Sequence, residues 1–304
     1  MRSHPSKVVV SQEVFESEQS RTYTLVRPRA VRAGAPLVLV LHGLRDTYDS
    51  TRRYCGGSFD RFAARDGAVV AYPDGVDREW NSARKAVMLS RRVKTIDDVG
   101  FLRALAEQLV TTWDLSAQPY VVGFSLGGQM AIRLICDAPG LLAGAALISS
   151  TLPAPGNRAC SSLPPIPVPV LTFHGTADAL APWSGGTVGL RLVPGQRRPF
   201  FGKGPHESVP ETLEWFARRN GIDGAPVTDW LHTGSGWAGR IAYESPGVPP
   251  VTGYTVIGGG HEIPGPRWHR FRPDTEVGGG LIAADAIAEF FGLAHIGPGS
   301  LPSS

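Results

Sequence analysis

Residues 119–127 read PYVVGFSLG, and their order predicts a strand, a tight turn and the start of a helix. The turn is Gly-x-Ser-x-Gly centred on Ser125, and its glycines leave room for a strained serine backbone whose hydroxyl stands clear of the sheet. At a helix start, backbone N–H groups favour a developing negative charge. The string alone also fits a glycine-rich structural turn, but the apolar run before it and the helical pattern after it favour a nucleophile elbow. That pattern is made by Met130, Ala131, Leu134 and Ile135.

The composition predicts one α/β domain spanning residues 1–304. Hydrophobic residues make up 42% and charged residues 19% of the 304, which is enough to bury a sizeable core. We expect the core at about 20–292 and a flexible Gly/Pro/Ser-rich tail at 293–304. The net charge of +3 and the short basic clusters do not indicate a nucleic-acid-binding surface.

The N-terminus and the cysteines bear on the cellular compartment. The apolar stretch at 8–10 is too short for a signal-peptide core, and no run reaches transmembrane length. We therefore expect a cytoplasmic protein without a membrane partner, or a secreted one if a signal was removed. Three cysteines leave at least one unpaired, which fits a reducing compartment better than a disulfide framework. Whether any of Cys55, Cys136 and Cys160 pair stays open.

Strand-like and helix-like segments alternate along the chain. This alternation predicts an α/β fold with a mainly parallel sheet and helices on both faces. Strands are expected at 7–13 and 21–26, as a hairpin, and at 37–41, 68–72, 119–122, 145–148, 168–173 and 254–257. Helices are expected from Asp98, after Ser125, from a capping box at 208–211, and over 281–291.

A serine nucleophile needs a base, and two positions supply a base and its acid partner. Asp178 lies in the loop after the strand ending at 173, and His261 follows the last strand before the closing helix. This order of serine, acid and histidine is that of α/β-hydrolases. The alternatives that Asp178 is a turn residue and His261 an incidental loop histidine stay open. The rivals lack a comparable position: Asp137, Asp223, Asp285, His206, His232, His269 and His295.

Acyl transfer also needs hydrogen-bond donors aimed at the oxyanion. We expect the backbone N–H groups of Leu126, after the nucleophile, and of Leu44, in the loop after strand 37–41, to supply them. The neighbouring His42 is interpreted as a structural brace of this loop rather than a second base.

The motifs taken together resemble the polyhydroxybutyrate depolymerase-like and feruloyl esterase family of α/β-hydrolases. The resemblance implies a serine esterase for short esters of hydroxy acids, aromatic acids or acetylated sugars, with Ser125, Asp178 and His261 as its triad. It spans roughly residues 37–292. The matching strings are LHG at 41–43, AYPDG at 71–75, WN at 80–81, DDVGF at 97–101, GFSLGGQM at 123–130, HGTAD at 174–178 and GGGH at 258–261.

The chain departs from this family beside the histidine. Family members usually carry Thr-Trp-Pro there, where this chain has Glu262-Ile263-Pro264, and that tryptophan borders the active site. Many relatives are also secreted and contain disulfides, whereas this sequence shows neither a signal peptide nor a clear pairing of its cysteines. The first departure bears on the substrate preference, and the lack of a signal and of a clear cysteine pairing points to a small, soluble ester rather than a polymer.

Other residues of the family-like segments have weaker interpretations. Trp80, Trp183 and Tyr48 are candidates for an acyl pocket, with packing under loops as an equal alternative. Asp98 is interpreted as a helix N-cap. Residues 230–243 are expected to form a hairpin or flap near the site.

The function expected is hydrolysis of a small-molecule ester through an acyl-enzyme, without cofactor or metal. An acyltransferase with the same triad is the first alternative, and a catalytically silent hydrolase fold used for binding is the second. A serine peptidase would share the site but usually brings an accessory domain. The oligomeric state is not indicated by the sequence.

Overall fold

A computed structural model gives the fold. It describes residues 8–17, 20–86, 93–161, 163–187, 204–232, 236–266, 276–277 and 280–293. The predicted tail beyond Leu293 and the rival histidines His269 and His295 lie outside these residues.

A ten-stranded sheet runs through the molecule in the order β1-β2-β4-β3-β5-β6-β7-β12-β11-β10. The strands from β4 to β12 in this order are parallel to one another, while β1, β2, β11 and β10 add antiparallel edges. The strands are β1 (Val8–Phe15), β2 (Arg21–Pro28), β3 (Leu37–Leu41), β4 (Val69–Pro73), β5 (Tyr120–Phe124), β6 (Gly144–Ile148), β7 (Val170–Gly175), β10 (Val227–His232), β11 (Trp237–Ser245) and β12 (Val248–Val256).

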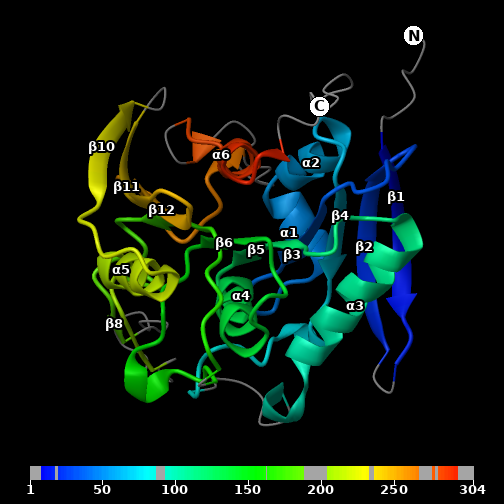
Figure 1. The fold of residues 1–304 in the computed structure, drawn as a ribbon, viewed down its shortest axis with the longest axis horizontal. Coiled ribbons are helices and arrows are strands. Elements are labelled where there is room, and N and C mark those ends of the chain that lie inside the picture. The colour runs from blue at the N-terminus through cyan, green and yellow to red at the C-terminus, as the bar shows by residue number, and fades with distance from the viewer. Residues whose placement is uncertain are drawn as a thin grey trace, which may run out of the picture.

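Helices cover both faces of this sheet (Figure 1). One apolar cluster joins the sheet to α3, α4 and α5, and a second joins it to α2 and α6, so the expected α/β architecture is confirmed. The helices are α1 (Tyr48–Tyr54), α2 (Arg61–Ala64), α3 (Asp98–Trp113), α4 (Leu126–Asp137), α5 (Val209–Asn220) and α6 (Ala283–Phe290). Minor elements are the strand pairs β8 (Gly186–Thr187) with β9 (Pro205–His206) and β13 (Gly265–Pro266) with β14 (Glu276–Val277), and 3-10 turns at Ser58–Asp60, Val76–Arg78, Val93–Thr95 and Pro155–Asn157.

The segment expected as a hairpin or flap is the outer edge of the sheet. β10 and β11 form the hairpin, and β11 pairs along β12. β12 begins at Val248 rather than near 254, because Pro249 and Pro250 mask the strand pattern. The register between β11 and β12 shifts where these prolines lie, which lets the strand accommodate them.

The start of α3 differs from the expectation. Asp97, not Asp98, is the N-cap, since its side chain accepts a hydrogen bond from the N–H of Gly100 at 2.8 Å. Asp98 is buried, pairs with Arg21 at 2.5 Å and accepts the N–H of Asn81 at 2.6 Å. Burial raises the pKa of Asp98, and the attraction of Arg21 opposes that shift. Two adjacent aspartates both suit a helix start, so the residue types alone do not distinguish them.

Replacing Arg21 by methionine should strongly destabilise the protein. The change leaves the Asp98 carboxylate buried without its counter-charge, which costs about 3–5 kcal/mol of unfolding free energy. Urea unfolding measures this loss. The matched control is Arg218→Met on exposed α5, where loss of the pair with Glu214 should cost about 1 kcal/mol or less. Equal losses in the two variants would contradict the assignment.

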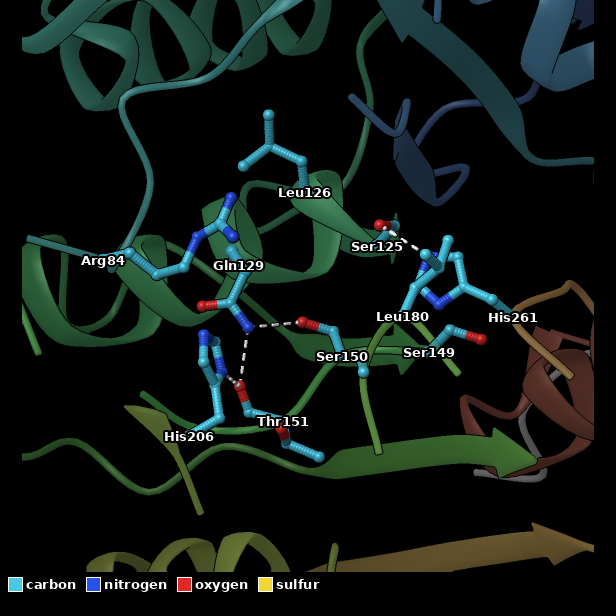
Figure 2. A pocket seen from close by; sticks show the side chains of 11 residues that line it. Arg84, Ser125, Leu126, Gln129, Ser149, Ser150, Thr151, Leu180, His206 and His261 are labelled. Atoms are coloured by element: carbon cyan, nitrogen blue, oxygen red, sulfur yellow. Dashed lines mark hydrogen bonds between the residues drawn. The ribbon is translucent and has the colours of Figure 1, made fainter. Parts of the chain in front are cut away.

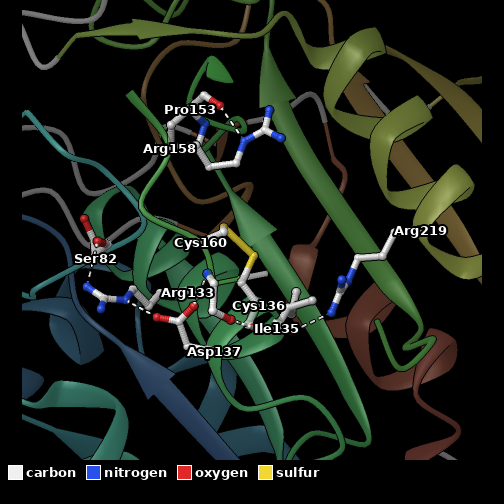
Figure 3. Close-up of a disulfide and its surroundings, with 10 residues drawn as sticks. Ser82, Arg133, Ile135, Cys136, Asp137, Pro153, Arg158, Cys160 and Arg219 are labelled. Carbon is white, nitrogen blue, oxygen red and sulfur yellow. Dashed lines mark hydrogen bonds and ion pairs between the residues drawn. A yellow bond between two sulfur atoms is a disulfide. The ribbon is translucent and has the colours of Figure 1, made fainter. Parts of the chain in front are cut away.

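A disulfide joins the end of α4 to the loop that follows β6 (Figure 3). Cys136 and Cys160 are 24 residues apart, and their Cα atoms are 5.3 Å from each other. Cys55 is free and buried. The sequence left the pairing open, because no spacing signal links a helix residue to a proline-rich loop, and the structure has one disulfide and one free cysteine.

Candidate active site

Ser125 stands at the sharp turn between β5 and α4. Its backbone has φ 53° and ψ −110°, a strained conformation for a residue with a side chain, and its N–H donates to the carbonyl of Ile148 at 2.9 Å. The two flanking glycines make the turn possible. A Cβ on Gly123 would lie 2.4 Å from the carbonyl oxygen of Gly127, and one on Gly127 would lie 2.2 Å from that of Leu41.

Three side chains meet at this turn. Nε2 of His261 lies 2.8 Å from Oγ of Ser125, and Nδ1 of the same ring lies 2.8 Å from Oδ2 of Asp178. Asp178 follows β7 and His261 follows β12, which are neighbouring parallel strands, so both loops reach the same edge of the sheet. The structure thus brings together the three residues that the sequence selected. This chain of hydrogen bonds allows a proton to pass from the serine to the imidazole while the carboxylate faces the resulting charge.

The surroundings of the Asp178 carboxylate favour its ionised form. Burial alone would raise its pKa, but the hydrogen bond and charge of His261 and the N–H of Ala181 lower it, and the net shift is downward. Oδ1 accepts from the N–H groups of Leu180 and Ala181 at 2.9 and 2.8 Å. Nε2 of His174 lies 3.4 Å from Oδ2 and donates to the carbonyl of Ala181. Burial lowers the pKa of His174, which favours its neutral form.

The rival residues lie elsewhere or have other partners. Asp137 pairs with Arg133, Asp285 pairs with Arg61 and Arg65, and Asp223 and His232 are exposed. His206 is the exception, because it lines the cavity beside Ser125 without being bonded to the serine.

Hydrogen bonds of His42 and Trp80 hold the loop after β3 in place. Nδ1 of His42 donates to the carbonyl of Gly43 at 2.7 Å, and Nε2 accepts the N–H of Gly75 at 2.9 Å. Burial lowers the pKa of His42, so the ring is neutral and suited to these two bonds. The indole of Trp80 is buried against this ring and donates to the carbonyl of His42 at 3.1 Å.

This brace holds the loop after β3 beside the elbow. The carbonyls of Leu41 and His42 approach Gly127 closely, so the loop that carries Leu44 lies against the first turn of α4. Leu126 is the first residue of α4, where an N–H has no acceptor within the helix. Within the described part of the chain, the N–H of Leu44 donates no hydrogen bond to the protein.

A narrow cavity opens beside Ser125 and His261 (Figure 2). Its empty volume is about 280 Å³, part of which is open to solvent. Sequence reasoning missed several of its residues. Gln129 lies four residues after Ser125 on the same face of α4, and that spacing could have revealed it. Arg84 and His206 carry no such signal, because Arg84 lies in a loop and His206 in the short strand β9, both far from Ser125 in the sequence. The lining comprises Arg84, Ser125, Leu126, Gln129, Ser149, Ser150, Thr151, Leu180, Ala181, His206 and His261.

The three pocket candidates from the sequence do not line this cavity. Trp80 is the buried brace of the loop after β3. Trp183 packs against the core and donates to Oγ1 of Thr255 at 3.2 Å, and Tyr48 begins α1 beside Asp74.

Glu262 and Ile263, where the chain departs from the family, do not line the cavity; Glu262 instead supports the loop that carries His261. Oγ of Ser149 donates to the carbonyl of Glu262 at 3.1 Å and accepts its N–H at 3.2 Å. The Glu262 carboxylate accepts the N–H of Gly260 at 3.3 Å, so it closes the turn that carries His261. Ile263 is buried in the core.

Two searches of the described residues give limited findings. No group of three or more histidine, cysteine, aspartate or glutamate side chains is placed to hold a metal ion there. Likewise, no helix in the described ranges combines the length and hydrophobicity needed to span a bilayer.

Three proteins of known name are similar to this chain in sequence, whereas no family model matches it. NocK of Nocardia uniformis subsp. tsuyamanensis, which is named as an esterase, is 32% identical over 266 residues, covering 84% of this chain and 74% of NocK. Feruloyl esterase B of Piromyces equi is 27% identical over 63% of this chain, and poly(3-hydroxyalkanoate) depolymerase C of Paucimonas lemoignei is 25% identical over 78%. The chain spans only 34% and 57% of the lengths of these last two.

A solved structure shares the fold. The acetyl xylan esterase from Aspergillus awamori superposes with a TM-score of 0.63 over 94% of this chain and 100% of that one. At 15% identity this likeness concerns the fold alone.

Proposed function

The chain belongs to the polyhydroxybutyrate depolymerase-like and feruloyl esterase family of α/β-hydrolases, and we propose that Ser125, His261 and Asp178 are its catalytic triad. The chain is a carboxylic ester hydrolase. The observation that carries the triad is the continuous path from Oγ of Ser125 through the imidazole to the carboxylate, with 2.8 Å at each step.

The reaction follows from this path in two halves. Nε2 of His261 takes the Ser125 proton as Oγ attacks the ester carbonyl, and Asp178 stabilises the imidazolium. When the tetrahedral intermediate collapses, the C–O bond to the alcohol breaks and the imidazolium returns the proton to the leaving alkoxide. Water then attacks the acyl-enzyme with His261 again as base, and the acid leaves as Ser125 regains its proton.

The oxyanion of each intermediate would be held by two backbone donors. The N–H groups of Leu126 and Leu44 lie on the two segments that meet at Gly127. Donors fixed by the fold need no reorganisation as the negative charge develops, which is the main source of their effect.

The proposed substrates are short hydroxyacyl, aromatic-acyl or acetyl esters. The names of the relatives supply the aromatic-acyl and hydroxyacyl classes, the acetyl class comes from the family resemblance of the sequence, and the narrow cavity favours a small acyl group. For the compartment, the Cys136–Cys160 disulfide favours the secreted alternative over the expected cytoplasm, because cytosolic reductants keep thiols reduced.

Trapping the acyl-enzyme tests the mechanism. Rapid acid quench during turnover of p-nitrophenyl acetate should give the peptide containing Ser125 the mass of one added acetyl group, with a burst of one p-nitrophenol per active site. An acetyl group found on another residue would contradict the proposal. Methanol added in small amounts separates the alternatives, since release of acetic acid indicates a hydrolase and release of methyl acetate as the main product indicates an acyltransferase.

A further inference from the structure

Arg84 is a cation in the wall of the catalytic cavity. Within the described chain no carboxylate forms an ion pair with it, and its Nε is buried without a hydrogen-bond partner. Burial lowers the pKa of Arg84 to about 10, with Glu79 as the charge that opposes this shift. The guanidinium therefore stays protonated at neutral pH. A partly buried charge without a counter-charge costs free energy, which a bound anion would recover.

The backbone on either side of Arg84 is held in place by hydrogen bonds. On one side, the N–H of Ala83 donates to the carbonyl of Gln129 at 3.1 Å, which fixes the segment to the first turn of α4. On the other, the N–H of Lys85 donates to the carbonyl of Asn157 at 2.6 Å. Figure 2 shows the guanidinium beside this turn of α4, on the side of the cavity where Leu126 and Gln129 lie. The backbone from which the Arg84 side chain extends is thus fixed beside the cavity before any substrate arrives.

We infer that Arg84 binds a carboxylate of the substrate, so that the enzyme prefers esters bearing a free carboxylate near the ester bond. This inference rests on the proposed function, because it concerns the cavity that holds Ser125. A guanidinium offers a planar pair of donors that matches the two oxygens of a carboxylate. Arg84 is also the sole cationic side chain fixed in charge among the described lining residues, which matches an anion of one charge better than a phosphate of two.

Two matched ester pairs test the inference, since the carboxylate could belong to the acyl or to the alcohol part. Monoethyl glutarate against ethyl pentanoate places the charge on the acyl part, and 4-acetoxybenzoate against 4-acetoxytoluene places it on the alcohol part. We expect the wild type to prefer the carboxylate member of at least one pair. Arg84→Met should lower kcat/KM for that member by about 30-fold, because a charged hydrogen-bonded pair is lost, and should change the neutral member by less than about threefold.

Two further variants and the possible outcomes distinguish failure of the carboxylate assignment from failure of the proposed function. Arg84→Lys keeps the charge but not the paired donors and should fall between wild type and Arg84→Met, while Arg103→Met on the exposed face of α3 should change neither ester. Equal rates for both members in the wild type, or equal losses for both in Arg84→Met, would overturn the carboxylate assignment. Failure of the proposed function would look different: the wild type would not hydrolyse the neutral esters, or Ser125→Ala would.

Discussion

Replacing Ser125 by alanine should lower kcat/KM for p-nitrophenyl acetate by about 10,000-fold or more, because the acyl-enzyme can no longer form. The protein should stay folded. Oγ forms one hydrogen bond to a partly exposed histidine, and loss of such a bond costs about 1 kcal/mol or less. Initial rates with the purified variant, together with its thermal unfolding curve, measure both expectations.

The control for this variant is Ser116→Ala. Ser116 is partly exposed, and its hydroxyl donates to the carbonyl of Gly34 away from the cavity, so activity should stay within about twofold of the wild type. A folded Ser125→Ala protein that keeps a tenth or more of the activity would refute the nucleophile assignment.

Replacing Asp178 by asparagine should lower kcat by about 10,000-fold while preserving the shape of the site. The amide lacks the negative charge that stabilises the imidazolium, and its NH₂ group can hold the ring in the tautomer that leaves Nε2 protonated. Because the pKa of Asp178 is lowered, the wild-type carboxylate is ionised throughout the neutral range, and the loss should not be rescued by raising the pH.

Asp285→Asn is the matched control for Asp178→Asn. Asp285 is one of the rival acids from the sequence, and it pairs with Arg61 and Arg65 on α2 rather than with any residue of the site. The change should leave activity within about twofold. Similar losses in both variants would show that Asp178 has no special place in the reaction.

The sequence predicted the central sheet because its strands are short apolar runs ended by turn residues. The apolar run predicted before Ser125 and the one predicted before Asp178 begin and end within two residues of the observed strands β5 and β7. Parallel neighbours end at one edge, so knowing the strands was enough to bring Ser125 and Asp178 together. The capping box at Ser208 likewise fixed the start of α5.

The errors occurred where long-range contacts override local patterns. Pro249 and Pro250 hid half of β12, because only the pairing with β11 shows that the irregular register tolerates them. Trp80 belongs to a family-like segment and was a candidate for the acyl pocket, yet its indole donates a hydrogen bond to the carbonyl of His42 and does not line the cavity.

Arg84 could not be found from the sequence for a related reason. An arginine in a loop is usually solvated, and nothing in its neighbours indicates burial. Its place in the cavity depends on hydrogen bonds to Gln129 and to the loop of Asn157, which lies over 70 residues further along the chain.

The Cys136–Cys160 disulfide connects the nucleophile helix α4 to the loop that supports Arg84. Cys136 ends the helix that begins beside Ser125, and Cys160 follows the loop residue Ala159, whose N–H donates to the carbonyl of Ala83 at 2.7 Å. The disulfide is therefore a covalent link between the nucleophile helix and the loop that supports Arg84, and it supplements the hydrogen bond from the N–H of Ala83 to the carbonyl of Gln129.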